Sequence, residues 1–227
     1  MRLVLLPGLN GSSNLFAPLL DALRDVDCQP LALPDQGPQD YASLTDRLLA
    51  ELGHAPFVLL GESFSGPLAF RLALRKPEGL RAVIFAATFL TRPSPFLALL
   101  RHMPMPPALV THAPILRALC LGRDVEDAVL RRVQEEIRSL DQALVRARLG
   151  SLAGLRAVQG RLAVPALQLW PQQDRLVAAR AGGSLAAHCD DLRQVRLDGP
   201  HFILQARPHA CAQAIRTFLA DMAKQQG

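Results

Sequence analysis

The chain has 227 residues, 50% of them hydrophobic, so it can bury a sizeable core within one domain. The formal net charge is +5, but the arginines that carry it are mostly scattered, without a basic run or interleaved aromatic residues. This spacing favours a solvated surface and argues against nucleic-acid binding. The first apolar run ends at Pro7 and Gly8, too early for a signal peptide or a membrane span, so we expect a cytoplasmic protein.

The cysteines are widely spaced, with no Cys-x-x-Cys pair and no Cys/His ligand spacing. They are Cys28, Cys120, Cys189 and Cys211. We therefore expect reduced thiols, no disulfide framework, no metal site and no other cofactor.

Apolar runs alternate with amphipathic segments, as in a parallel sheet covered by helices on both faces. We expect strands at residues 3–6, 28–33, 57–60, 82–86, 165–170 and 192–197. Helices are expected at residues 14–23, 41–52, 67–75, about 178–188 and 208–223. The sequence therefore predicts an α/β fold with a mostly parallel, six-stranded sheet.

The alternation stops between residues 91 and 161. A proline-rich apolar stretch comes first, and Asp124 then offers an N-cap, with Asp127 three residues on. Apolar residues beyond it follow one face of what we expect to be a single long helix: Val125, Val129, Val133, Ile137, Leu140, Leu144 and Leu152. We therefore predict a helical insertion at residues 91–161, within a core formed by residues 1–90 and 162–227.

A serine lies at a predicted strand-to-helix junction, in the hexapeptide GESFSG at residues 61–66. A serine hydroxyl becomes a good nucleophile only where a base can reach it on a tightly turned backbone. The small residues Gly61 and Ser65 on either side of Ser63 permit such a turn, although Ser65 replaces the usual glycine of Gly-x-Ser-x-Gly. The hexapeptide predicts a nucleophile elbow, and the alternative is an ordinary turn.

An acid and a histidine follow the last two predicted strands. Asp174 lies in the loop after residues 165–170, and His201 lies in the loop DGPHF after residues 192–197. Serine, acid and histidine, in that order, are the chain order of the α/β-hydrolase triad. Asp198 is a competing acid, but it comes at the end of its strand, which favours Asp174.

These stretches, together with LLPGLNGS at residues 5–12 and WPQQDRLV at residues 170–177, resemble the α/β-hydrolase superfamily in its compact bacterial esterase-like branch. The resemblance implies Ser63 as the nucleophile, His201 as general base and then acid, and Asp174 as the group that orients the imidazole. It also implies that residues 91–161 form a helical cap. The antiparallel hairpin that usually opens this fold has no counterpart before residue 3.

The oxyanion formed during acyl transfer needs hydrogen-bond donors. We expect the backbone N–H of Phe64, at a helix start, and that of Leu9, in the loop that takes the place of the family's His-Gly-x segment. Pro7 stands where histidine is common in that loop. Substrate-pocket candidates are Asn10, Phe96, Leu100, Met103, Met105 and Leu116, unless the cap residues among them are ordinary core.

The sequence thus predicts a serine hydrolase that cleaves a carboxylic ester or thioester with an apolar acyl group through an acyl-enzyme. The alternatives are a cofactor-free perhydrolase, a carbon–carbon bond hydrolase, or a non-catalytic hydrolase-like ligand-binding protein. A basic helical face fits an acidic acyl-carrier protein as substrate carrier, although the same residues could simply solvate a helix. Its residues are Arg131, Arg132, Arg138, Arg146, Arg148 and Arg156.

Overall fold

A computed structural model of the protein describes residues 1–93 and 111–226. Its centre is a six-stranded sheet in the order β2-β1-β3-β4-β5-β6, with every pair of neighbours parallel. The strands are β1 (Arg2–Leu6), β2 (Cys28–Pro30), β3 (Phe57–Glu62), β4 (Leu80–Ala86), β5 (Ala166–Pro171) and β6 (Leu192–Leu197). All six predicted strands are present, and no antiparallel strand joins them in the described part of the chain.

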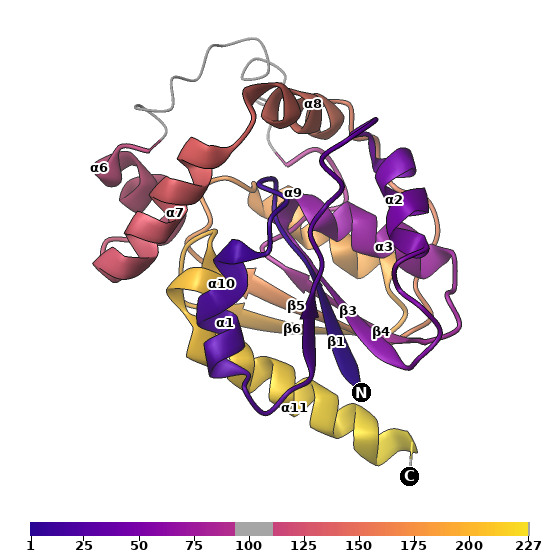
Figure 1. Ribbon diagram of the computed structural model, residues 1–227. Helices are drawn as coiled ribbons and strands as arrows, with labels where there is room; N and C mark the ends of the chain where they lie inside the picture. Colours follow the sequence, from indigo (N-terminus) through magenta and orange to yellow (C-terminus); the bar gives the residue numbers. More distant parts are fainter. Residues whose placement is uncertain (94–110, 227) are drawn as a thin grey trace.

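Side chains alternate between the two faces of the sheet, so a strand that is covered on both sides contributes to two cores. Leu3 and Leu5 pack on one side with α1 (Ala17–Ala22) and α11 (Pro208–Gln226). Val4 and Leu6 pack on the other side with α2 (Tyr41–Leu49), α3 (Gly66–Leu74) and α9 (Ala179–Gly182). Figure 1 shows these two helical layers on either side of the sheet. The chain therefore has the predicted α/β-hydrolase architecture.

Short helical turns join several of these elements. They are the 3₁₀ helices η1 (Asn14–Phe16), η2 (Ser63–Ser65) and η4 (Gly183–His188), and the single helical turn α10 (Ile203–Ala206).

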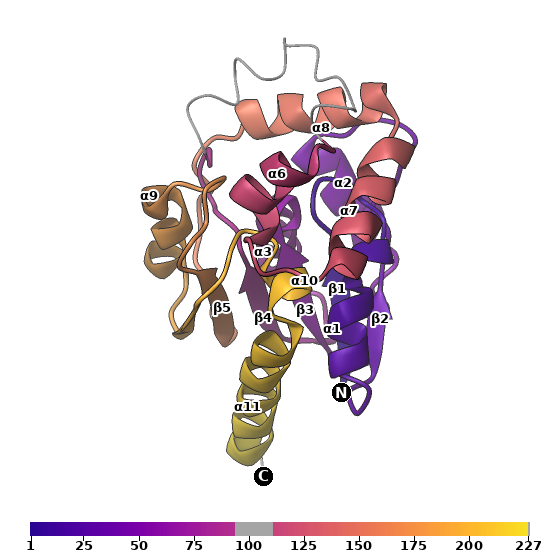
Figure 2. The same ribbon diagram turned by 90° about the vertical axis from the view of Figure 1, so that its left-hand side faces the viewer.

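The connection from β4 to β5 adds helices outside these layers. Its described part holds α6 (Ala113–Leu116), the π-helical turn η3 (Arg117–Leu121), α7 (Asp127–Ser139) and α8 (Gln142–Ala153). Figures 1 and 2 show α7 and α8 at the end of the molecule opposite the N-terminus of β1. Since the strands are parallel, these helices lie toward the carboxyl ends of the strands, where the loops carry the predicted site.

The prediction of one long helix in this connection is wrong. The backbone is extended at Leu140, and the Asp141 carboxylate then accepts the N–H groups of Ala143 and Leu144 as the N-cap of α8. This local cap ends one helix and begins another, although the apolar pattern runs across the break.

Asp124 is not an N-cap either. Residue Glu126 occupies the N-cap of α7, without a side-chain hydrogen bond. Asp124 instead forms an ion pair of 2.7 Å with Arg207.

A third apolar cluster attaches α6, η3 and α7 to η1. It consists of Leu15, Leu116, Leu121, Val125, Leu130 and Val133. Leu116, a predicted pocket residue, packs inside this cluster and is 2% exposed.

Candidate active site

Ser63 lies on the turn between β3 and α3, where the backbone is held in an unusual conformation. Its φ is +47°, in the left-handed region that few residues other than glycine adopt. The Ser63 carbonyl accepts a hydrogen bond from the hydroxyl of Thr88, a buried residue just after β4. This strained turn, supported from the neighbouring strand, is the geometry of a nucleophile elbow.

Gly61 is the small residue that the turn requires. A Cβ added there would lie 2.5 Å from the Ser65 carbonyl oxygen and 2.8 Å from Ala69 Cβ. We expect Gly61→Ala to lower the free energy of unfolding by about 3 kcal/mol, because the clash is with backbone. Gly150→Ala is the control: nothing lies within 4 Å of that site in α8, so it should stabilise by about 0.5–1 kcal/mol. Urea unfolding measures both, and equal stabilities would contradict this account of the turn.

The structure brings Ser63, His201 and Asp174 together. Ser63 Oγ lies 2.9 Å from His201 Nε2, and His201 Nδ1 lies 2.7 Å from Asp174 Oδ2. The side chains of His201 and Asp174 are 4% and 7% exposed, so water screens their interaction weakly. Asp174 Oδ1 accepts the N–H groups of Leu176 and Val177 at 2.8 and 2.9 Å, which fixes the carboxylate. The contacts match those of a base that takes the serine proton while an acid orients its ring.

The competing acid Asp198 takes no part in this cluster. Its Oδ1 accepts a hydrogen bond of 2.6 Å from Gln173 Nε2, and the residue is exposed.

Two backbone N–H groups near Ser63, those of Leu9 and Phe64, donate to no other group within the described residues. The loop after β1 lies against the elbow, since a Cβ placed on Gly8 would be 3.9 Å from Ser63 Cβ. An oxygen anion bound next to Ser63 would find both donors unpaired, as an oxyanion hole requires.

The two departures from the family pattern contact each other. The hydroxyl of the fully buried Ser65 donates to the carbonyl of Pro7. Ser65 stands in place of a glycine and Pro7 in place of a histidine, and together they tie the loop after β1 to the elbow. Sequence reasoning missed this bond, although a hydroxyl at a position that favours glycine was a visible signal.

Glu62, the residue before Ser63, is a buried carboxylate. It accepts a hydrogen bond from Gln205 Nε2 at 2.9 Å. Burial raises the pKa of Glu62, while the Gln205 hydrogen bond, the charge of His201 and the Gly8 N–H oppose the rise.

The raised pKa of Glu62 has a consequence for stability. Between its ordinary value of 4.5 and its folded value, the folded state binds the proton more tightly than the unfolded chain. Wild-type stability, measured relative to Glu62→Gln, should therefore fall as the pH rises through that window and stay constant above it. Urea unfolding of both proteins from about pH 4 to 8 measures the difference. If the free energy of unfolding varied with pH in the same way for both proteins, the result would contradict the raised pKa of Glu62.

The other predicted pocket residues divide into two groups. Asn10 turns its amide toward α7, where Nδ2 donates to Glu136 Oε1 at 3.1 Å, and it also donates to the Ser12 carbonyl. Phe96, Leu100, Met103 and Met105 lie outside the described residues.

Arg148 does not belong to the predicted basic face. It is 1% exposed and donates hydrogen bonds to the loops after β1 and β2. The exposed members of that face are Arg131, Arg132, Arg138, Arg146 and Arg156.

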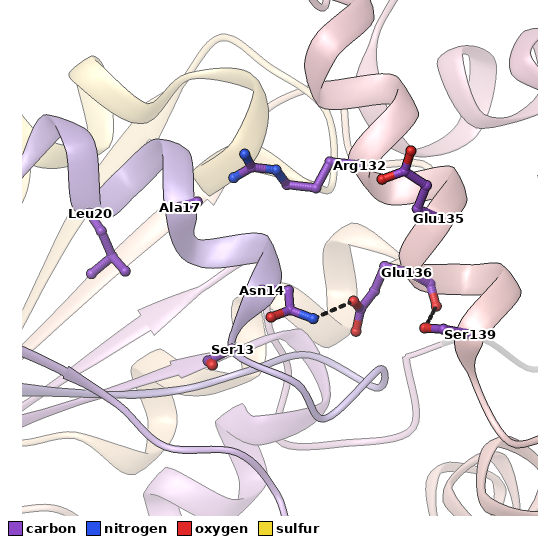
Figure 3. Close-up of a pocket in the computed structure, with 8 residues that line it drawn as sticks. All are labelled: Ser13, Asn14, Ala17, Leu20, Arg132, Glu135, Glu136 and Ser139. Carbon is purple, nitrogen blue, oxygen red and sulfur yellow. Dashed lines mark hydrogen bonds between the residues drawn. The ribbon is translucent and has the colours of Figure 1, made fainter.

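A separate open groove lies between η1, α1 and α7, with a volume of about 540 Å³ (Figure 3). Its lining residues are Ser13, Asn14, Ala17, Leu20, Arg132, Glu135, Glu136 and Ser139. None of them belongs to the Ser63 cluster.

In residues 1–93 and 111–226, no group of three His, Cys, Asp or Glu side chains could hold a metal ion. No helix in those ranges has both the length and the apolar character needed to cross a membrane.

Known proteins share this architecture. Residues 2–113 match the family described as alpha/beta hydrolase fold. The enol-lactonase from Burkholderia xenovorans LB400 is 20% identical, with a TM-score of 0.80 over 96% of this chain and 91% of its own. A thermophilic esterase from Thermogutta terrifontis is also 20% identical, with a TM-score of 0.80 over 98% and 90%. A type II thioesterase from the borrelidin biosynthetic cluster is 23% identical, with a TM-score of 0.70 over 95% and 91%.

A comparison with curated proteins found no match. The family match over residues 2–113 and the likeness to these structures show that the chain has the α/β-hydrolase fold. At such low identities, the solved structures support the fold and not a substrate.

Proposed function

We propose that the protein is a serine hydrolase that cleaves a carboxylic ester or thioester with an apolar acyl group. The observation that carries the proposal is the series of contacts from Ser63 Oγ through His201 to Asp174, beside two N–H groups that donate to nothing in the described part of the chain. Each element is one that acyl transfer to serine requires, and the three side chains come from loops after β3, β5 and β6.

The geometry supports a two-step reaction. His201 Nε2 takes the proton of Ser63 as Oγ attacks the carbonyl carbon, and the resulting oxyanion accepts the N–H groups of Leu9 and Phe64. The imidazolium, stabilised by Asp174, then gives its proton to the departing alcohol or thiol and leaves an acyl-enzyme. His201 next takes a proton from the water molecule that attacks the acyl carbon. The second oxyanion then collapses, the bond from the acyl carbon to Ser63 Oγ breaks, and His201 returns the proton to Oγ as the carboxylic acid leaves.

The apolar acyl group is proposed from the sequence between β4 and β5, which contains Phe96, Leu100, Met103 and Met105. We propose that α7 and α8 belong to a cap, because they lie over the carboxyl ends of the strands (Figure 2).

A fluorophosphonate probe tests the nucleophile directly. We expect one molecule of probe to bind per chain, on the peptide that contains Ser63, as located by mass spectrometry. A series of p-nitrophenyl esters of increasing chain length then measures the depth of the acyl pocket. A folded protein that stays unmodified would contradict the proposal and favour a ligand-binding protein. Labelling at Ser63 without hydrolysis of any ester or thioester would instead favour perhydrolysis or carbon–carbon bond cleavage.

An acidic acyl-carrier protein is a proposed partner, supported by the exposed Arg131, Arg132 and Arg138 of α7. If these charges attract a carrier, kcat/KM for a carrier-linked ester should fall with added salt more steeply than kcat/KM for a p-nitrophenyl ester. The same salt dependence for both substrates would contradict docking.

A further inference from the structure

The loop after β1, residues 7–13, is held by a buried arginine of α8. Arg148 is 1% exposed, and its Nη1 donates to the carbonyl oxygens of Leu9 and Asn10, both at 2.9 Å. Its Nε donates to Gln39 Oε1 at 3.0 Å, and its Nη2 to the Pro34 carbonyl at 3.3 Å. One guanidinium therefore joins the loop that carries Leu9 to the loop after β2 and to α8.

A buried carboxylate of α7 holds the same loop from another side. Glu136 is 6% exposed and accepts hydrogen bonds from Asn10 Nδ2 at 3.1 Å, from the Ser12 hydroxyl, and from Asn14 Nδ2 at 3.0 Å. Figure 3 shows the last of these bonds, which crosses from η1 to α7. The loop after β1 is thus fixed to both long helices of the β4–β5 connection.

These contacts bear on the direction of the Leu9 N–H. That N–H belongs to the Gly8–Leu9 peptide, whose oxygen accepts the Gly11 N–H at 3.0 Å. The oxygen of this planar group is therefore held by Gly11, and the next carbonyl, that of Leu9, is held by Arg148. A peptide fixed at both of these points has little freedom to rotate, so the direction of its N–H depends on Arg148.

The loop sequence accommodates the arginine. Gly11 has a φ of +78°, and a Cβ there would lie 2.0 Å from Arg148 Nη1. The guanidinium therefore occupies the space that a side chain at position 11 would need. The contact between Arg148 and the loop therefore requires glycine at position 11, and this requirement is separate from the hydrogen bonds.

We propose that Arg148 and Glu136 are positioning residues, which hold the loop after β1 so that the Leu9 N–H faces the oxyanion next to Ser63. Burying a guanidinium and a carboxylate costs more than burying apolar side chains of the same size, so their presence is best explained by the polar groups that they orient. The inference rests on the proposed function. It implies that the geometry of the oxyanion hole depends on the positions of α7 and α8.

Replacing Arg148 with methionine removes the donors and keeps most of the side-chain volume. We expect Arg148→Met to lower kcat for p-nitrophenyl butyrate about 10- to 100-fold, with KM changed less than about threefold. Affinity for a trifluoromethyl ketone, whose adduct with Ser63 carries the oxyanion, should fall by the same factor as kcat/KM. Glu136→Gln should have a smaller effect in the same direction. Arg123→Met, an exposed arginine in the same connection, is the matched control and should retain both values.

The ketone affinity separates positioning from stability. An Arg148 that served packing alone would lower Tm while the folded variant kept its kcat and ketone affinity, and that result would overturn the proposal. If Arg148→Met does not fold, Arg148→Lys supplies the measurement: one ammonium replaces part of the donor set, so we expect a partial loss of kcat at unchanged KM. An unchanged kcat in that variant would also overturn it. A wild type that neither hydrolyses esters nor reacts at Ser63 would instead remove the proposed function, and this inference with it.

Discussion

Replacing Ser63 with alanine should lower kcat for a p-nitrophenyl ester by about a million-fold. Without Oγ no acyl-enzyme can form, and only binding and the oxyanion donors remain to assist attack by water. The release of p-nitrophenol measures the rate, and Tm shows whether the variant is folded. We expect Tm to change little, because among the described residues the Ser63 hydroxyl hydrogen-bonds only to His201.

Ser43→Ala is a suitable control for this variant. Ser43 lies in α2, where its hydroxyl donates to Asp40, and it has no contact with the Ser63 cluster. Its kcat should match that of the wild type. If Ser63→Ala kept near-normal activity on every ester tested, Ser63 would not be the nucleophile.

The four central strands were predictable because β1, β3, β4 and β5 are apolar runs, largely buried and bounded by turn residues. The edge strand β6 instead alternates roughly between apolar and polar residues. β6 has its predicted bounds, at Leu192–Leu197. β2 ends three residues earlier than predicted, at Pro30, because the chain leaves the sheet and the Leu33 N–H bonds to the Gly11 carbonyl in the loop after β1. This contact depends on a loop that is distant in the sequence, so no local sequence pattern predicts it.

The helical connection shows the limit of periodicity. Apolar spacing carries on across Leu140 and Asp141, yet the Asp141 carboxylate caps a new helix there. The position of Arg148 was also predicted wrongly from periodicity, because a charged residue on an amphipathic helix is expected to face solvent. Its main hydrogen-bond partners are backbone carbonyls 139 and 138 positions earlier in the chain. Every residue has a backbone carbonyl, so the amino-acid sequence does not indicate which of them accept hydrogen bonds from Arg148.

The candidate site was predictable for a topological reason. Ser63, Asp174 and His201 each follow a strand of one parallel sheet, so they meet at the same edge. Two supports of the site were not predictable, since Thr88 and Arg148 donate to main-chain oxygens of the elbow and of the loop after β1. The bond from Ser65 to the Pro7 carbonyl had one sequence signal, the serine at a position that favours glycine.

Replacing Asp174 with asparagine should lower kcat by about ten-thousand-fold, through the tautomer of His201. Oδ1 of Asp174 accepts the N–H groups of Leu176 and Val177, so an asparagine must keep its carbonyl oxygen there. Its NH₂ group then faces His201 Nδ1, which has to become an acceptor. The imidazole proton moves to Nε2, and Nε2 can no longer take the proton of Ser63.

Asp198→Asn is the matched control for this change, because it neutralises the competing acid, whose carboxylate contacts Gln173 and not His201. Its kcat should stay within about threefold of the wild type. In Asp174→Asn, the rate of fluorophosphonate labelling at Ser63 should fall with kcat while KM stays nearly constant, because the substrate still binds and only activation of Oγ is lost. Loss of activity in Asp198→Asn, with retention in Asp174→Asn, would reassign the acid to the β6 loop.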